Sequence, residues 1–160
     1  MPNADLIGQR FGVPRLVHGI VSKLLVALIV VCGAISALMY VFVFLPRWQA
    51  ATKASLWYLT CFTGWLWTAT AYHFYRAVSI VPDATAETVV GPSVGATNIC
   101  KKCDSPKASF VHHCNVCGRC VPMMDHHCPF INNCAGRHNF VHFIFFLGCA
   151  TTGAALASCA

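Results

Sequence analysis

Seven cysteines and two His-His pairs lie in one stretch of the chain, residues 100–134, which reads CKKCDSPKASFVHHCNVCGRCVPMMDHHCPFINNC. Thiolates and imidazoles are the ligands that zinc prefers, and a Cys-x-x-Cys turn brings two thiolates to one tetrahedral ion. Six cysteines stand at such ligand spacings. With two imidazoles they supply the eight ligands of two closed, structural zinc sites. The six are Cys100, Cys103, Cys114, Cys117, Cys120 and Cys134.

The imidazole ligands come from the pairs His112-His113 and His126-His127, and spacing alone does not choose between the members of a pair. A disulfide framework fits less well, because seven is an odd number and disulfides give the histidines no role. An iron–sulfur cluster bound by four thiolates would also leave the histidines unused. We therefore predict that this segment binds zinc.

The seventh cysteine, Cys128, is left over beside Asp125 and His126. A nucleophilic cysteine needs a base or a cation that maintains its thiolate, and the base needs a carboxylate that orients it. These three residues offer all three roles within four positions. If His127 binds zinc, its neighbour His126 is directed elsewhere and is free to act as the base. The alternative is that Cys128 is a spare thiol or an alternative metal ligand.

The elements that must position this segment are apolar, since 57% of the chain is hydrophobic and only 10% is charged. We predict three membrane-spanning helices, at residues 24–45, 56–76 and 140–160, because each run is long enough to cross a bilayer. Too few polar residues remain to cover three such helices in water. The expected fold is therefore an α-helical multi-span membrane protein with a zinc-bound domain of loops and hairpins between spans 2 and 3.

The distribution of basic residues predicts the orientation in the membrane. The tail, residues 1–23, and the segment between the second and third spans must lie on the same side, because two crossings separate them. Together with Arg76 at the end of the second span, that side holds nine of the eleven lysines and arginines and is therefore predicted to be cytosolic. A reducing cytosol also keeps thiols available for zinc and for chemistry. The loop at 46–55 is then lumenal or extracellular.

The remaining segments carry fewer signals. Residues 77–99 contain prolines, glycines and small residues and are predicted to be a cytosolic linker. We find no internal repeat and no phosphate-binding loop, and a membrane-tethered segment without a basic amphipathic helix does not favour nucleic-acid binding. The spans are expected to pack through small residues, namely Gly33, Ala34, Gly148 and Gly153.

The tetrad Asp125-His126-His127-Cys128, followed by Pro129 and by Asn133-Cys134, has many fixed spacings. Together with the upstream Cys-x-x-Cys, the HHC at 112–114 and Asn139 after Gly136, it resembles the signature of the DHHC family of protein S-acyltransferases, or palmitoyltransferases. The resemblance covers the cysteine-rich domain at 100–139 and extends, in architecture, to two preceding spans and one following span.

The resemblance implies a ligand set for each of two structural zinc ions and a role for the leftover thiol. Cys128 would accept the acyl group, with His126 as the base and Asp125 as its orienting partner. Palmitoyl-CoA, or another long-chain acyl-CoA, would donate the acyl group as a thioester to Cys128. A cysteine of a membrane-associated protein substrate would then receive it. One zinc ion would be bound by Cys100, Cys103, His113 and Cys120, and the other by Cys114, Cys117, His127 and Cys134.

The chain also departs from the family pattern. Phe130 stands where the family usually has Trp, the residues 107–110 lack the family's Pro and Arg, and no Asp-Pro-Gly follows the second span. Family members have at least four spans and a Thr-Thr-x-Glu motif, so the sequence is expected to be truncated after its third span. The alternative function is therefore a non-catalytic membrane zinc scaffold, or an inactive fragment of such an enzyme. The resemblance places the protein in the endomembrane system, Golgi or ER, or in the plasma membrane.

Overall fold

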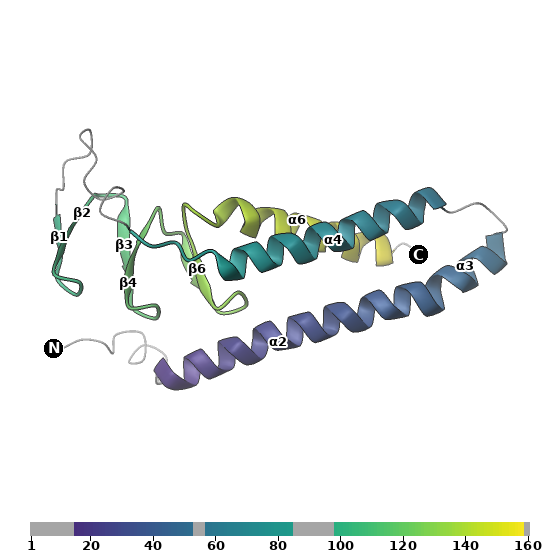
Figure 1. Ribbon diagram of the computed structural model, residues 1–160, viewed down its shortest axis with the longest axis horizontal. Helices are drawn as coiled ribbons and strands as arrows, with labels where there is room; N and C mark the ends of the chain where they lie inside the picture. Colours follow the sequence, from purple (N-terminus) through teal and green to yellow (C-terminus); the bar gives the residue numbers. More distant parts are fainter. Residues whose placement is uncertain (1–14, 53–56, 85–97, 159–160) are drawn as a thin grey trace.

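The computed structural model describes residues 15–52, 57–84 and 98–158 (Figure 1). Long helices form one part of the molecule, and three short β-hairpins stack at one end of them. Parts of several predicted segments lie outside the described residues: 1–14 of the tail, 53–56 of the first loop, 85–97 of the linker, and 159–160.

The first apolar segment is one continuous helical rod. It consists of α2 (Arg15–Met39), a π-helical turn η1 (Tyr40–Phe44) and α3 (Leu45–Thr52). The π-turn, in which the Leu45 amide donates to the Tyr40 carbonyl, immediately precedes Pro46. Proline cannot donate a helix hydrogen bond and its ring crowds the carbonyl four residues earlier, so a local widening lets the helix continue. The rod therefore extends beyond the span predicted at 24–45 and into the loop predicted at 46–55.

Helices α4 (Trp57–Ser79) and α6 (Phe140–Ser158) pack side by side (Figure 1). Phe74 meets Phe146 with ring centroids 5.1 Å apart. The expected packing through small residues is only partly present. A Cβ on Gly153 would lie 3.6 Å from Leu66, whereas among the described residues a Cβ on Gly148 would meet nothing within 4 Å.

Helix α2 contacts the other helices along one stripe. Ser22 is fully buried, and Val26 and Ile29 pack against the cluster that contains Phe74. Just beyond α2, Tyr40 of the π-turn hydrogen-bonds Thr63 at 2.7 Å. Most of the rest of its surface is apolar and exposed, as is typical of a helix surrounded by lipid rather than water. The exposed side chains include Leu24, Leu28, Val30, Val31, Ile35 and Leu38.

Two helical stretches of the described chain are long and apolar enough to cross a membrane, Gly19–Ala50 and Phe140–Ser158. They correspond to the first and third predicted spans. Helix α4 has 23 residues, so it is long enough, but its threonines, tyrosines and single arginine make it less apolar. The second membrane span therefore remains a prediction.

The cysteine-rich segment folds into three two-stranded antiparallel hairpins, as the expectation of loops and hairpins requires. They are β1–β2 (Asn98–Cys100 with Ser105–Lys107), β3–β4 (Val111–Cys114 with Arg119–Pro122) and β5–β6 (His126–Cys128 with Asn133–Ala135).

The three hairpins form a repeat with a period of 14 residues, so the prediction of no internal repeat is wrong. Each first strand ends on a cysteine, Cys100, Cys114 or Cys128, and each turn has a residue of positive φ four positions later. Those residues are Asp104, Gly118 and Asn132, types that tolerate the left-handed conformation. The signal was the interval of 14 between equivalent cysteines, which is shorter than the periods of most repeat families.

The predicted linker is ordered where it meets the hairpins. Helix α4 continues to Ser79, past the boundary predicted at residue 76, and Pro82 beyond it is fully buried. The Ala84 amide donates to the Cys120 carbonyl. A Cβ on Gly136 would lie only 2.7 Å from the side chain of Val121, so any larger residue at this position would clash with its neighbours. The end of α4 is thus attached directly to the cysteine-rich domain.

Candidate metal centres and a buried thiol

The first cysteine and histidine group joins the first two hairpins. Nδ1 of His113 lies 3.7 Å from the Cys100 sulfur, 3.2 Å from the Cys103 sulfur and 3.9 Å from the Cys120 sulfur. The sulfurs of Cys103 and Cys120 are 3.6 Å apart. His113 and Cys120 face each other across the β3–β4 ladder, while the end of β1 supplies Cys100 and the turn after it supplies Cys103. The four ligand atoms all lie within 4.8 Å of one another.

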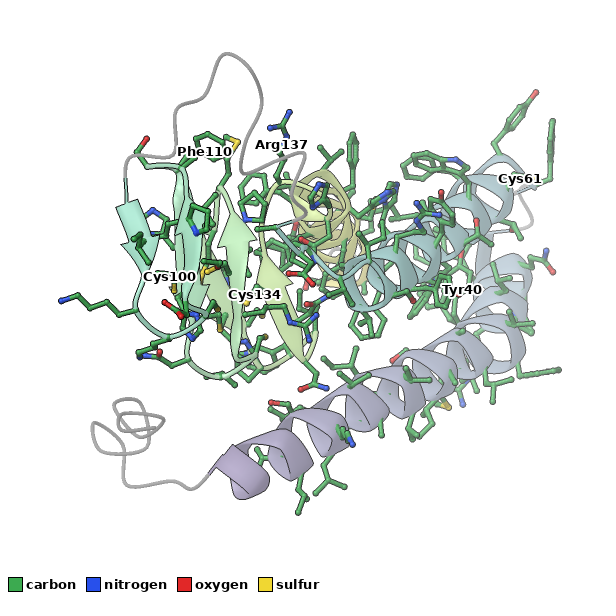
Figure 2. The ribbon with its side chains drawn as sticks, turned by 60° about the vertical axis from the view of Figure 1, so that its left-hand side comes forward. Tyr40, Cys61, Cys100, Phe110, Cys134 and Arg137 are labelled. Carbon is green, nitrogen blue, oxygen red and sulfur yellow. The ribbon has the colours of Figure 1, made fainter. Side chains whose placement is uncertain are left out.

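The second group joins the second and third hairpins in the same way. Nδ1 of His127 lies 3.7 Å from the Cys114 sulfur, 3.3 Å from that of Cys117 and 3.7 Å from that of Cys134. The sulfurs of Cys117 and Cys134 are 3.4 Å apart. Figure 2 shows Cys100 and Cys134, one from each group, inside the stack of hairpins.

Both groups fit a tetrahedral zinc ion. Bonds of about 2.3 Å to sulfur and about 2.0–2.1 Å to nitrogen place two ligand atoms roughly 3.5 to 3.8 Å apart. The separations above scatter around those values, and soft thiolate and imidazole donors suit zinc. All eight predicted ligands are therefore gathered into two sets of four, and these are the sets that the resemblance implied.

Strand alternation decides which histidine of each pair enters a group. Successive side chains of a strand point to opposite faces. His113 and His127 are half-buried and reach the sulfurs, whereas His112 and His126 are exposed on the other faces of β3 and β5. The ambiguity left by spacing is resolved by this local geometry.

Hydrogen bonds among the ligand side chains shift their pKa values. Hydrogen bonds with Cys117 and Cys134 hold the pKa of Cys114 well below its usual range. Burial favours the neutral imidazole of His127, but hydrogen bonds to Cys114 and Cys117 outweigh it and raise its pKa to about 9. Burial, assisted by the thiols of Cys100 and Cys103, raises the pKa of Cys120 to about 12.

Cys128 belongs to neither group. In the 14-residue repeat it is equivalent to the ligands Cys100 and Cys114, but the position equivalent to Cys103 and Cys117 is Ile131. Cys128 is 6% exposed and packs in a cluster with Ile131 and with side chains of both helices, namely Phe74, Ala77 and Phe143. In the third hairpin this cysteine therefore contacts the ends of the helices and does not face a metal group.

His126 lies on the same face of β5 as Cys128, because side chains two positions apart in a strand point to the same face. Its Nδ1 is 3.0 Å from Oδ2 of Asp125. Its ring meets Phe143 of α6 edge to face, with centroids 5.5 Å apart. The carboxylate and the aromatic ring together fix the orientation of the imidazole, and Phe143 is a contact that the sequence did not indicate.

Residues 93–160 match the family model described as DHHC palmitoyltransferase. This part of the chain is therefore a domain of the DHHC palmitoyltransferase type. The DHHC domain comprises the three hairpins and α6, and it contains both metal groups, Asp125, His126 and Cys128. Members of this family are membrane proteins, in agreement with the two apolar helices.

Curated palmitoyltransferases are similar to part of this chain. Palmitoyltransferase pfa3 of Aspergillus fumigatus is 46% identical over 84 residues, which are 51% of this chain and 15% of the relative. Palmitoyltransferase ZDHHC16A of Danio rerio is 34% identical over 109 residues, 65% of this chain and 26% of the relative. Human palmitoyltransferase ZDHHC3 is 53% identical over 47 residues, 29% of this chain and 16% of the relative. The chain thus spans about a quarter or less of the length of these relatives.

Proposed function

We propose that this protein is a protein S-acyltransferase that moves a long-chain acyl group, typically palmitoyl, from acyl-CoA to a cysteine of a membrane-associated protein. The observation that carries the proposal is the thiol of Cys128. It is equivalent in the repeat to two metal ligands, but it belongs to neither metal group and lies on the same face of β5 as His126. The relatives described above are named palmitoyltransferases, which supports the same reaction class.

In the first stage, His126 removes the proton of the Cys128 thiol. Because Nδ1 of His126 donates to the Asp125 carboxylate, Nε2 is the nitrogen that accepts this proton. The thiolate attacks the carbonyl carbon of the acyl-CoA thioester, the acyl–enzyme thioester forms, and the thiol of CoA leaves with a proton. In the second stage, a thiolate of the target protein attacks the acyl–enzyme, receives the acyl group and releases Cys128.

The fatty chain would lie among the helices that border Cys128. Each buried methylene contributes roughly 0.8 kcal/mol. An apolar cavity of about 160 Å³ lies between the first helical rod and α4, and it is one place where such groups can be buried. It is lined by Ala37, Tyr40, Val41, Leu45, Thr60, Gly64 and Trp67.

Two zinc ions, bound by the two groups, would hold the hairpins together. Each group supplies four protein ligands, so the sites are closed and structural, and the chemistry is left to Cys128 and His126. The apolar clusters around the first two hairpins are small, so the fold of these hairpins would depend on the metal ions.

Zinc binding is expected to weaken as the pH falls. Below a pH of about 9 the free imidazole of His127 holds a proton, and below about 12 the free thiol of Cys120 does. Both protons must leave before zinc binds, so each site releases at least one. Each released proton weakens binding roughly tenfold per unit of acidification. Competition with a chromophoric chelator at pH 6, 7 and 8 measures this slope, and an affinity that does not change with pH would contradict it.

The membrane orientation proposed here places the N-terminus and the DHHC domain on the cytosolic side of an endomembrane or the plasma membrane. Nine of the eleven basic residues fall on that side. The beginning of α2 lies at the hairpin end of the molecule (Figure 1), as a shared side requires.

The direct test is formation of the acyl–enzyme. The detergent-solubilised chain is incubated with an alkyne-tagged palmitoyl-CoA, and the label is challenged with hydroxylamine, which cleaves thioesters. A hydroxylamine-sensitive label is the expected result. If the chain takes no label while it retains two zinc ions, it is a scaffold or an inactive fragment rather than an acyltransferase.

His126→Gln is expected to slow acyl–enzyme formation by about 10² to 10⁴, the usual contribution of a general base. Zinc content should not change, because His127 and not His126 belongs to the metal group. A single-turnover time course of labelling measures the rate. His112→Gln is the matched control, since His112 occupies the equivalent exposed position 14 residues earlier. Equal rates in the two variants would exclude His126 as the base.

A further inference from the structure

The third hairpin supplies no Cys-x-x-Cys pair to a metal group, whereas each of the first two hairpins does. The first hairpin shares a group with the second, and the second shares one with the third. Continuing the repeat by 14 residues from His127 and Cys134 leads to Val141 and Gly148, which cannot bind a metal ion. Something else must therefore fix the hairpin side that carries Cys128.

The end of helix α4 meets two buried amide side chains of the DHHC domain. Nδ2 of Asn133 lies 3.2, 3.2 and 2.8 Å from the carbonyl oxygens of Ala77, Val78 and Ile80, and its two hydrogens are shared among these three acceptors. Nδ2 of Asn139 lies 2.9 Å from the carbonyl oxygen of Cys134, within its own domain, and 3.1 and 3.3 Å from those of Ala77 and Ile80, so its two hydrogens are shared between the DHHC domain and α4. Carbonyls in the last turn of a helix have no partner within the helix, so these two residues supply the missing donors.

The orientation of both amides is determined by their other contacts. Oδ1 of Asn133 accepts the Cys134 amide at 2.9 Å, and Oδ1 of Asn139 accepts the Gly136 amide at 3.0 Å. Each oxygen therefore faces an N–H donor, and each nitrogen faces carbonyls, which leaves one assignment of the amide. Asn133 is 6% exposed and Asn139 is fully buried.

These contacts lie directly opposite the thiol. Asn133 is the register partner of Cys128 in the β5–β6 ladder. On the same hairpin, Ile131 and Ala135 pack with Phe74, Ala77 and Phe143 of the two helices. Hydrogen bonds and apolar contacts thus attach the third hairpin to the helices at the height of Cys128.

We propose that Asn133 and Asn139 are positioning residues that hold Cys128 against the ends of α4 and α6 and so align its thiol with an acyl chain bound among the helices. The third hairpin shares the second metal group through His127 and Cys134, and the hydrogen bonds to α4 hold the side of it that carries Cys128. The alignment of an acyl chain rests on the acyltransferase function proposed above, whereas the attachment of the hairpin does not.

The test uses the full chain with Asn133→Asp and, separately, Asn139→Asp. Aspartate has nearly the same shape, but it cannot donate and it places a negative charge against carbonyls at the negative end of the helix dipole. Asn115→Asp is the matched control, because Oδ1 of Asn115 accepts a hydrogen bond from Lys102 and a carboxylate can do the same. Three quantities are measured: zinc per chain, the rate at which a hydrophilic maleimide modifies Cys128, resolved by peptide mass spectrometry, and labelling by alkyne-tagged palmitoyl-CoA.

We expect both variants to retain two zinc ions, to react with maleimide roughly tenfold faster or more because Cys128 becomes exposed, and to lose palmitoyl labelling by a similar factor. Unchanged maleimide and labelling rates in both variants would overturn the proposal. So would zinc loss in both, which would make the asparagines supports of the metal sites, or faster maleimide reaction with normal labelling. If the unmodified chain takes no palmitoyl label, the acyltransferase function fails, and the maleimide rate alone decides whether the asparagines hold the hairpin.

Discussion

Replacement of Cys128 by serine is expected to reduce hydroxylamine-sensitive palmitoyl labelling to background and to leave two zinc ions bound. Cys128 lies outside both metal groups, so its sulfur is not needed for the fold of the DHHC domain. The serine hydroxyl fits the same small space but ionises far less readily than a thiol, whose pKa is about 8.5, so the nucleophile is lost.

Labelling with alkyne-tagged palmitoyl-CoA, followed by hydroxylamine and in-gel detection, measures the first quantity, and elemental analysis of the purified chain measures the second. Cys149→Ser in α6 is a control for loss of a thiol outside the DHHC motif. Labelling of Cys128→Ser at the level of the unmodified chain would place the acyl group on another residue and remove the basis of the proposed mechanism.

Cys114→Ser is expected to have a different and more general effect, namely loss of zinc and unfolding of the DHHC domain. Cys114 is 1% exposed, ends β3 and belongs to the group that joins the second hairpin to the third. Structural zinc contributes about 10–16 kcal/mol of apparent binding free energy in zinc-finger peptides, so a domain with little other core depends on it. Palmitoyl labelling should be lost as a consequence.

Zinc content and limited proteolysis between residues 98 and 139 measure this outcome. Cys128→Ser is the matched control, because it is the same substitution at the equivalent position of the next 14-residue repeat. Equal zinc loss in the two variants would show that Cys128 also binds metal, and full zinc retention in both would show that Cys114 does not. Either result would contradict the division of roles between the two cysteines.

The metal groups were accessible to sequence reasoning because their chemistry is local. Cys-x-x-Cys turns and the intervals between them bring thiols together with little help from the rest of the fold, and Cys128 was recognisable as the thiol left over. The choice of His113 and His127 came from the family resemblance, and the structure brings those two to the sulfurs. Alternation along β3 and β5 supplies the physical reason, since it directs the neighbouring histidines to the opposite face.

Several boundaries were not accessible in this way. The first helix continues to Thr52 because a π-turn accommodates Pro46, and α4 continues to Ser79 because side chains from the DHHC domain cap its end. Asn133 and Asn139 were noticed only as parts of a motif, and nothing in their spacing shows that both reach the carbonyls of a helix more than 50 residues earlier.

The sequence by itself therefore determined the ligand chemistry, the free thiol with its histidine and carboxylate, and the apolar character of the first and last helices. All of these depend on residue type and on spacing over a few positions. Only the tertiary structure decided how the third hairpin is attached to α4 and α6, and with it where Cys128 lies relative to the helices. That placement depends on hydrogen bonds and side-chain packing between distant segments, and such contacts leave no periodic signal in the chain.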